Sequence, residues 1–265
     1  MTVIPALEAF RFLSIIPVPG RTIADDRLAR AVAFFPLVGA ALGGLLVLID
    51  WAGSKAFPAA YHAMAAAFVI AAYALFTRGL HYDGLMDTAD AFLGARSRED
   101  RLRIMKDSRI GAFGVMSLIV LLLVELASIY SLPEYISNAN GKLRWAALLC
   151  VPVFGRWAMS YMCARFPYAR DEGTGSAIVV NAGWKEIVIA SVIAFIGISC
   201  SFIFIVKDPW LIALLLLLSF GIAETAGRFF TRSIGGVTGD TVGATAMVVE
   251  CVLLVVLASR LPELL

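Results

Sequence analysis

Residues 78–92, "RGLHYDGLMDTADAF", place three aspartates and a histidine in a chain that is otherwise mostly apolar. Asp83, Asp87 and Asp90 are four and then three residues apart, so in an α-helix they share one face. Like charges on one face repel each other and need water, arginines or a cation to compensate them. Magnesium suits such a stripe, because it binds a few carboxylates, keeps waters and shares oxygens with substrate phosphates. The spacing therefore predicts a magnesium site on these three residues.

A solvated helix face is the simpler interpretation of this aspartate stripe, and in a soluble protein it would be the better one. Here the stripe adjoins apolar segments long enough to cross a membrane, where uncompensated charge is costly and usually functional. His81 lies two residues before the stripe. Because magnesium favours oxygen ligands, we predict a role in catalysis or beside the substrate for His81, and no metal bond.

A basic segment, "SREDRLRIMKDSRIGAFG", follows at residues 97–114. Ser97 with Asp100 three residues later resembles a capping box, which predicts a short helix. Lys106 and Arg109 beside the carboxylates indicate that the metal carries polyphosphate, since guanidinium binds phosphate through two hydrogen bonds. We assign both to catalysis. Their neighbours form two groups: the substrate-binding candidates Asp107 and Ser108, and the cytoplasmic anchors Arg96, Arg98 and Arg101.

Two later segments complete the candidates. "GRWAMSYMCARFPYARDEGTG" (155–175) carries Arg156 inside an apolar run, where an arginine should face a polar cavity and a partner rather than lipid. "RSIGGVTGDTVGA" (232–244) is glycine-rich, and glycines let the backbone approach phosphate closely. The substrate-binding candidates here are Arg156, Arg165, Tyr168, Arg170, Gly239 and Asp240, with Asp171 and Glu172 in the same loop. For the glutamates in apolar segments, Glu125, Glu224 and Glu250, we predict protonated or paired structural roles.

The composition is that of a membrane protein. Of the 265 residues, 60% are hydrophobic and 16% charged, and the mean hydropathy is +0.86, whereas soluble domains have roughly 45–50% apolar and about 25% charged residues. A spanning helix needs about 20 apolar residues. We predict an all-α, polytopic membrane bundle forming one domain, residues 1–265, with seven spans at 32–50, 61–77, 112–131, 143–163, 186–206, 210–227 and 243–260. The four cysteines, Cys150, Cys163, Cys200 and Cys251, are predicted to be buried thiols without disulfide or zinc.

The distribution of charge orients the bundle. Basic residues concentrate on the side of the N-terminus, which predicts that this side is cytoplasmic. Of the 22 lysines and arginines, 16 lie in residues 1–31, 78–111, 164–185 and 228–242. Residues 1–20 are broken by prolines and predict an interfacial helix rather than a signal peptide or a span. The net charge of +2 gives no reason to expect nucleic acid. Gly39 and Gly43 predict a helix-packing face.

This topology gathers the polar motifs at one membrane face, with residues 78–111 as a cytoplasmic catalytic loop. We predict that the aspartate stripe, Lys106–Arg109, Arg156 and Asp240 line one cytoplasm-facing cavity with an apolar rim, in which opposite charges offset each other. Either Arg156 or Asp240 in lipid, or farther than about 15 Å from the stripe, would contradict this prediction.

Five motifs, taken in order, resemble the cobalamin synthase family, the membrane-bound adenosylcobinamide-GDP ribazoletransferases of vitamin B12 assembly. They are "GLHYDGLMDTADAF", "RIMKDSRIGAFGV", "GRWAM", "FPYARDEGTG" and "GGVTGDTVGA", and "FRFLSIIPVPGR" near the N-terminus is also similar. The chain departs from the family pattern where Tyr82 and Met86 replace leucine and alanine, Arg78 replaces glycine and Thr174 replaces leucine. None of these departures removes a charged position, so they concern substrate contacts rather than the reaction.

The resemblance implies magnesium-dependent phosphoryl transfer. The ribose hydroxyl of α-ribazole, or of its 5′-phosphate, attacks the corrinoid-side phosphate of adenosylcobinamide-GDP, GMP leaves, and adenosylcobalamin or its 5′-phosphate forms. Such chemistry demands mainly positioning and charge neutralisation, which the aspartates, the metal and the basic residues would supply. His81 and Asp240 are the two candidates for the proton acceptor. The implied setting is the bacterial inner membrane, with small-molecule substrates and the lipid bilayer as partners; a homo-oligomer or contact with other cobalamin-assembly enzymes is left open.

Two alternatives are another membrane transferase of diphosphate substrates and, from a different class, a secondary transporter. A CDP-alcohol phosphotransferase needs DGxxAR followed by GxxxDxxxD, whereas "LMDTAD" follows Asp83–Gly84, and a prenyltransferase would need a second aspartate-rich motif. A secondary transporter would place polar groups near the bilayer midplane and often shows internal repeats. Here the acids gather at one face and no repeat is visible, so a transferase fits better.

Overall fold

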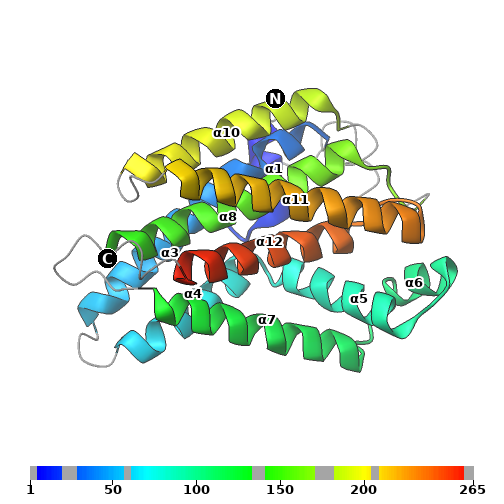
Figure 1. The fold of residues 1–265 in the computed structure, drawn as a ribbon, viewed down its shortest axis with the longest axis horizontal. Coiled ribbons are helices and arrows are strands. Elements are labelled where there is room, and N and C mark those ends of the chain that lie inside the picture. Colours follow the sequence, from blue (N-terminus) through cyan, green and yellow to red (C-terminus); the bar gives the residue numbers. More distant parts are fainter. Residues whose placement is uncertain are drawn as a thin grey trace.

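The computed structural model describes residues 5–19, 29–56, 61–132, 141–170, 182–203 and 209–259. Within these residues the chain is all-helical and forms no β-strand, which confirms the predicted fold class (Figure 1). The elements are α1 (Pro5–Leu13), η1 (Val32–Phe34), α3 (Phe35–Ala56), α4 (Tyr61–Phe76), α5 (Leu80–Gly94), α6 (Arg98–Ile104), α7 (Ala112–Ser131), α8 (Gly141–Arg165), α10 (Trp184–Ile203), α11 (Pro209–Ile234) and α12 (Gly239–Ser259).

The helices account for a multi-pass membrane protein. Among the described residues, five segments are long and apolar enough to cross a membrane: Ala29–Ala56, Ala112–Ser131, Leu143–Arg165, Trp210–Ile234 and Gly239–Ser259. α4 and α5 qualify only as a pair, and they are bent by 88° at the turn between them. α10 occupies the place of the predicted span 186–206, of which residues 204–206 lie outside the described ones. Each predicted span therefore coincides with a helix, and five or six of them meet the length and apolarity of a crossing.

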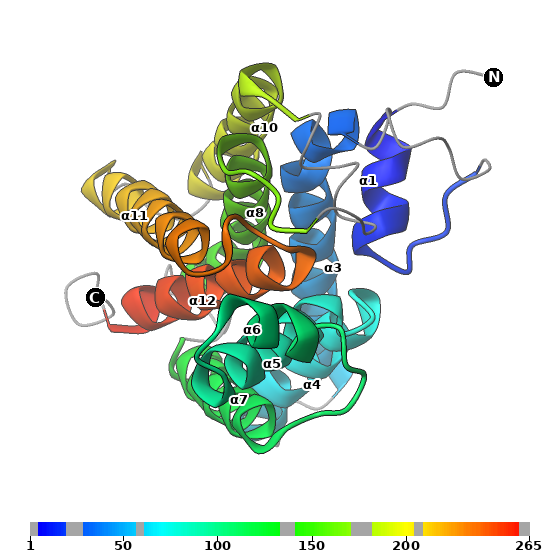
Figure 2. The same cartoon turned by 90° about the vertical axis from the view of Figure 1, so that its right-hand side faces the viewer.

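α8 lies at the centre of the bundle, with α3, α10, α11 and α12 around it (Figure 2). α3 approaches α8 most closely at two glycines. A Cβ on Gly39 or Gly43 would overlap the α8 backbone at Pro152–Val153 and Leu148–Leu149 respectively. The predicted small-residue packing face is confirmed by this contact.

α5 runs antiparallel to the first turns of α12 and continues towards α6 (Figure 1). Gly84 faces the backbone of Asp240, and His81 faces Gly243 one turn deeper. A Cβ on Gly84 would come within 2.8 Å of the Asp240 carbonyl oxygen, so only glycine permits this approach. The same register places Asp87 level with residue 237, before α12 begins. The outer half of α5 thus extends past the start of α12 and packs against α11, where the Phe92 ring centre lies 5.3 and 5.2 Å from those of Phe229 and Phe230.

The turn between α4 and α5 contains two consecutive residues in the left-handed region, Arg78 (φ 55°) and Gly79 (φ 64°). A residue other than glycine is strained there. Arg78 replaces a glycine of the family pattern, and its Nη2 donates to the carbonyls of Arg11 and Phe12 at 2.9 and 3.2 Å. These bonds tie the turn to the end of α1, the helix inside the predicted interfacial segment.

Candidate active site

Two loops from distant parts of the sequence meet at the polar end of the bundle. Tyr168 forms a parallel bridge with Val237, the Ala169 N–H donates to the Val237 carbonyl at 2.9 Å, and the Val237 N–H donates to the Pro167 carbonyl at 2.8 Å. Gly236 lies so close to the Pro167 carbonyl that a Cβ would overlap it. The bridge joins the "FPYAR" motif to the glycine-rich loop before α12.

Asp240 is held in the first turn of α12 by this arrangement. Thr238 and Thr241 cap the helix reciprocally: the Thr238 N–H donates to Oγ1 of Thr241 at 2.8 Å, and the Thr241 N–H donates to Oγ1 of Thr238 at 3.2 Å. Nη2 of Arg170 donates to Oδ2 of Asp240 at 2.9 Å. The structure therefore brings two predicted substrate-binding residues, 70 positions apart, into direct contact.

Asp83 and Asp87 lie across the α5–α12 contact from Asp240. Asp83 is exposed and Asp87 half-buried, and neither carboxylate has a hydrogen-bond or ion-pair partner among the described residues. Burial raises the pKa of Asp87 to about 7, and the neighbouring carboxylates, first that of Asp83 and then that of Asp240, add to the rise. Burial and the neighbouring negative charges thus both disfavour the charged form of Asp87, and a bound cation would offset them.

Asp90 is engaged elsewhere. It is 9% exposed, and its carboxylate accepts the N–H of Gly111 at 2.7 Å and of Gly114 at 2.8 Å, at the start of α7. A Cβ on either glycine would overlap the carboxylate. Asp90 therefore caps α7 from outside that helix and fixes the segment that joins α6 to α7.

The stripe thus divides into two open carboxylates and one capping carboxylate. No three His, Cys, Asp or Glu side chains within the described part of the chain converge as ligands of a metal ion. A magnesium ion that keeps waters and takes phosphate oxygens requires only one or two protein carboxylates, and Asp83 and Asp87 fit this need. Asp240, on α12, is an acid from another helix whose charge acts on Asp87. His81, 2% exposed, has no hydrogen-bond partner on either ring nitrogen among the described residues.

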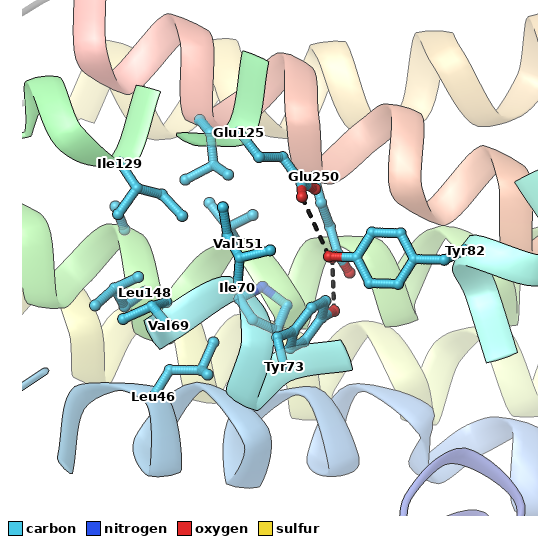
Figure 3. Close-up of a pocket in the computed structure, with 13 residues that line it drawn as sticks. Leu46, Val69, Ile70, Tyr73, Tyr82, Glu125, Ile129, Leu148, Val151 and Glu250 are labelled. Atoms are coloured by element: carbon cyan, nitrogen blue, oxygen red, sulfur yellow. Dashed lines mark hydrogen bonds between the residues drawn. The ribbon is translucent and has the colours of Figure 1, made fainter. Parts of the chain in front are cut away.

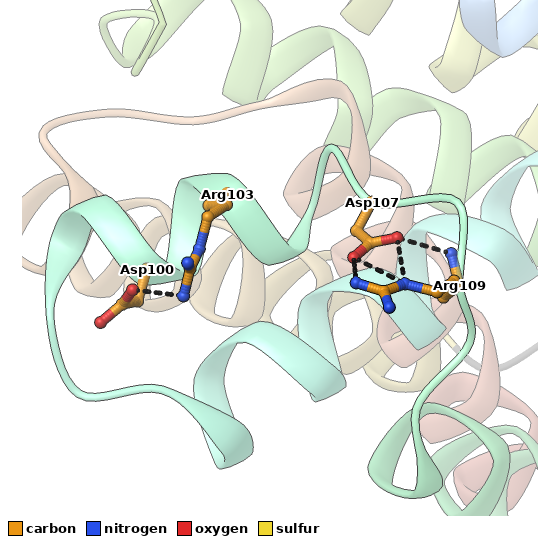
Figure 4. A network of polar contacts seen from close by, with 4 residues as sticks. All are labelled: Asp100, Arg103, Asp107 and Arg109. Atoms are coloured by element: carbon orange, nitrogen blue, oxygen red, sulfur yellow. Dashed lines mark hydrogen bonds and ion pairs between the residues drawn. The ribbon is translucent and has the colours of Figure 1, made fainter.

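The basic segment ends in a local ion pair. Nη2 of Arg109 donates to Asp107 at 2.6 Å, and Nε and the backbone N–H donate to the same carboxylate (Figure 4). These bonds lower the pKa of Asp107 to about 2. The Arg109 side chain is 88% exposed, so the pair lies in solvent. Lys106 and Ser108 are also exposed, and Ser97 caps α6 as predicted, accepting the Asp100 N–H at 3.1 Å.

Arg156 has the polar partner that its position in an apolar run predicted. It is completely buried, and its Nη1 donates to Glu250 and to the hydroxyl of Tyr73, which itself donates to Glu250 at 2.6 Å. Glu250 is ten residues beyond Asp240 on α12, about 15 Å along the helix axis. Arg156 therefore lies well below the polar end, in the interior of the bundle and away from lipid.

The other candidates of the same region lie at its surface. Arg165 is exposed, with its guanidinium 5.5 Å from the ring centre of Phe166. Tyr168 is half-buried in the bridge described above, and Gly239 is exposed with open space beside it. Asp171 and Glu172 lie outside the described residues.

Comparison with known proteins assigns the sequence to a family. The profile described as cobalamin-5-phosphate synthase matches residues 5–258. The chain belongs to the cobalamin-5-phosphate synthase family. It is 37% identical over 250 residues to the "Adenosylcobinamide-GDP ribazoletransferase" of Chlorobaculum tepidum, covering 92% of this chain and 91% of the relative. It is 32% identical over 267 residues to that of Roseiflexus sp. (97% and 90% covered), and 35% over 258 residues to that of Acinetobacter baumannii (94% and 95% covered). No solved structure matches.

Membership of the cobalamin-5-phosphate synthase family confirms the predicted resemblance and makes the chain a transferase of cobalamin biosynthesis. Tyr82 stands where the family pattern has leucine, and the structure shows what this tyrosine contacts. The Tyr82 hydroxyl donates to Glu125 at 3.1 Å, beside a cavity of about 30 Å³ that Tyr73 and Glu250 also line (Figure 3). This cavity is far too small for a corrinoid or a nucleotide. With Glu224 accepting from Tyr161 at 2.6 Å, the three intramembrane glutamates are all paired, as predicted.

Sequence reasoning missed one feature of this protein. Arg98 was assigned to membrane anchoring, yet its Nε donates to the Ile234 carbonyl at 2.8 Å and its side chain lines a cavity on α6. Arg103 and Lys106 line the same cavity. Part of the signal was present in the spacing: residues 98 and 102 are four positions apart and share a face of α6, and Lys106 follows just after that helix ends.

Proposed function

We propose that the protein transfers the adenosylcobinamide-phosphate group from adenosylcobinamide-GDP to α-ribazole or α-ribazole 5′-phosphate, with magnesium, and releases GMP. One observation carries the proposal beyond family membership: open carboxylates and a guanidinium meet at one end of a membrane bundle. Asp83 and Asp87 are unpaired among the described residues, and Arg170 reaches Asp240 across the loop bridge. A diphosphate with a divalent cation complements this mixture of charges.

The reaction breaks the bond between the corrinoid-side phosphorus and the oxygen that bridges to GMP, and it forms a bond from that phosphorus to the acceptor hydroxyl oxygen. GMP leaves with the bridging oxygen. The acceptor proton goes to a carboxylate, for which Asp240 is better placed than His81. Asp240 lies at the polar end of α12, whereas His81 is buried one turn deeper.

The chain supplies positioning and charge. Asp83 and Asp87 would hold magnesium, which when bound neutralises phosphate charge. Arg170 lies at the boundary between the acids and the basic face of α6, so its guanidinium can face a phosphate oxygen as well as Asp240. Asp90 keeps the α6–α7 segment, with Lys106 and Arg109, in place by capping α7.

The positive-inside asymmetry supports a cytoplasmic position for this end, because the predicted cytoplasmic segments include both α6 and the loop before α12. We propose the bacterial inner membrane as its location. Water-soluble substrates would then reach the acids directly, while the apolar helices hold the protein in the bilayer.

The test is GMP release by the purified full-length protein in detergent, with adenosylcobinamide-GDP, α-ribazole and a magnesium titration. We expect activity that needs magnesium and that Asp83→Asn and Asp87→Asn abolish, while their thermal unfolding stays like that of the wild type. Amide replacement preserves size but removes the charge that binds a metal. Arg96→Ala, an exposed position outside the acidic cluster, is the matched control. No GMP release by the wild type, or near-normal release by both aspartate variants at low magnesium, would refute the proposal.

A further inference from the structure

A second polar cavity, distinct from the acidic cluster, opens between α6 and the loop after α8. It has a volume of about 670 Å³, within the range of roughly 300–1,000 Å³ typical of small-molecule sites. Its charged wall is uneven, with four cations and one carboxylate. The residues that matter are Arg98, Glu99, Leu102, Arg103, Lys106 and Arg170.

Two of the cations build the wall. Arg98 donates from Nε to the Ile234 carbonyl at 2.8 Å and from Nη2 to the Ala169 carbonyl at 3.4 Å, which fixes α6 against the ends of α8 and α11. Arg170 both lines the cavity and pairs with Asp240. A ligand in the cavity therefore lies one side chain away from the acidic cluster.

The other two cations are available to a ligand. Arg103 pairs with Asp100 at 2.7 Å, but its side chain is 77% exposed, and exposed pairs contribute little (Figure 4). Lys106 is exposed, and its ammonium group makes no hydrogen bond or ion pair with the described residues. Both side chains can therefore turn to a phosphate with little loss of stabilising interactions within the protein. The excess of positive charge selects an anionic ligand.

Glu99 narrows the choice of anion. Its side chain is exposed, and its carboxylate, like the Lys106 ammonium, makes no hydrogen bond or ion pair within the described part of the chain. A carboxylate would repel a plain phosphate, so a ligand that uses it must also present hydrogen-bond donors. Guanine does so, because its N1–H and its amino group lie on one edge and both point to a carboxylate, whereas adenine has an acceptor at N1. A guanine nucleotide therefore complements both kinds of charge in the cavity, because its phosphate suits the cations and its guanine edge suits the Glu99 carboxylate.

We propose that this cavity binds the guanosine monophosphate half of the donor substrate, with Glu99 accepting from the guanine edge and Lys106 and Arg103 facing the phosphate and ribose. The inference rests on the proposed function, in which GMP is the leaving group. Arg170 would then lie where the nucleotide phosphate meets the corrinoid-side phosphate. Of the residues interpreted as membrane anchors, Arg98 becomes part of this leaving-group site.

The assignment of this cavity to GMP can be tested by measuring nucleotide binding directly, without turnover. Binding of GMP and of AMP to the purified full-length protein, in detergent and without magnesium or corrinoid, would be measured by calorimetry. We expect GMP to bind at least tenfold more tightly than AMP. Lys106→Ala and Arg103→Ala should each weaken both nucleotides about tenfold, the effect of losing one charge-assisted hydrogen bond. Glu99→Gln should weaken GMP alone and remove the preference, and Arg96→Ala should change neither affinity.

Equal affinity for GMP and AMP, absence of GMP binding, or GMP binding unaffected by Glu99→Gln and Lys106→Ala would overturn the proposal. So would variants that weaken α-ribazole 5′-phosphate and leave GMP unchanged, because the cavity would then hold the acceptor phosphate. The outcomes separate the two proposals. Glu99-dependent GMP binding without GMP release would refute the transfer reaction alone, whereas magnesium-dependent release without Glu99-dependent binding would refute the cavity assignment alone.

Discussion

Replacing Asp90 tests whether the third aspartate of the stripe caps a helix or holds a metal ion. Its carboxylate accepts the N–H groups of Gly111 and Gly114 at 2.7 and 2.8 Å, and its side chain is nearly buried. Asp87, one turn earlier on the same face, has no such partner among the described residues. We expect Asp90→Ala to destabilise the fold and Asp87→Asn to leave its stability nearly unchanged.

The magnitude follows from the two lost acceptors. A buried N–H left without its acceptor costs about 1–3 kcal/mol. Removing a negative charge from the N-terminus of α7 costs roughly 0.3–1 kcal/mol more. Because the Gly111 N–H is only partly buried and gains some water, we expect a total of about 2–4 kcal/mol. At roughly 2–4 °C per kcal/mol, the midpoint of thermal unfolding should fall by about 4–16 °C. Asp90→Asn keeps one acceptor oxygen and should lose about half as much.

The assay is thermal unfolding of the purified variants in detergent without magnesium, followed by tryptophan fluorescence, together with the magnesium dependence of GMP release. Asp90→Asn should unfold earlier but need about as much magnesium as the wild type. Asp87→Asn should unfold normally and lose magnesium-dependent turnover. An unchanged midpoint for Asp90→Asn, combined with a tenfold weaker apparent magnesium affinity, would refute the capping role and restore Asp90 as a metal ligand.

Three further outcomes are expected. Gly84→Ala, which places a Cβ against the α12 backbone, should shift α5 and lower the rate of GMP release by up to about 100-fold, whereas Gly44→Ala, which has open space, should not. Arg156→Met and Glu250→Gln should each cost about 3–5 kcal/mol in thermal or denaturant unfolding, because each leaves one buried charge or its partner unpaired; the double variant should cost less than their sum. A cysteine in place of Arg96 should react with an impermeant thiol reagent only after the membrane is opened, and labelling of intact cells would contradict the cytoplasmic orientation.

Much of the fold could be predicted because membrane helices are formed by long apolar runs that are visible in the sequence. Every predicted span coincides with a helix, and the glycine face of α3 packs where the spacing placed it. The predicted span 61–77 ends where α4 ends, but the sharp bend from α4 into a second helix, α5, was not predicted. It depends on a left-handed turn at Arg78 and Gly79, and Arg78 is held there by carbonyls of α1, more than 60 residues away. Apolarity alone contains no signal for such a contact.

For the site, the sequence could predict only which residues share a helix face. Spacing correctly places the three aspartates on one helix, but it cannot distinguish an open carboxylate from one that is already bonded. The partners of Asp90 are 21 and 24 residues along the chain, so its capping role is decided by tertiary structure. Arg156 shows the same limit, because its depth in the bundle follows from Glu250, 94 residues later. The charged residues of the motifs therefore fall into two groups. Some are already bonded to other protein groups, and the others have no protein partner among the described residues and are available to a ligand.

The glycines of the motifs mark this division. The glycine-rich sequence before α12 indicated backbone approach to phosphate, yet Gly236 faces the Pro167 carbonyl and Gly243 faces His81. Both are filled by protein, as is Gly84 against Asp240. Gly239 alone in this loop has open space beside it and is exposed, directly before Asp240. The loop therefore uses most of its glycines to bring helices together, and it leaves one short stretch of bare backbone, at the acidic cluster, where a phosphate can approach.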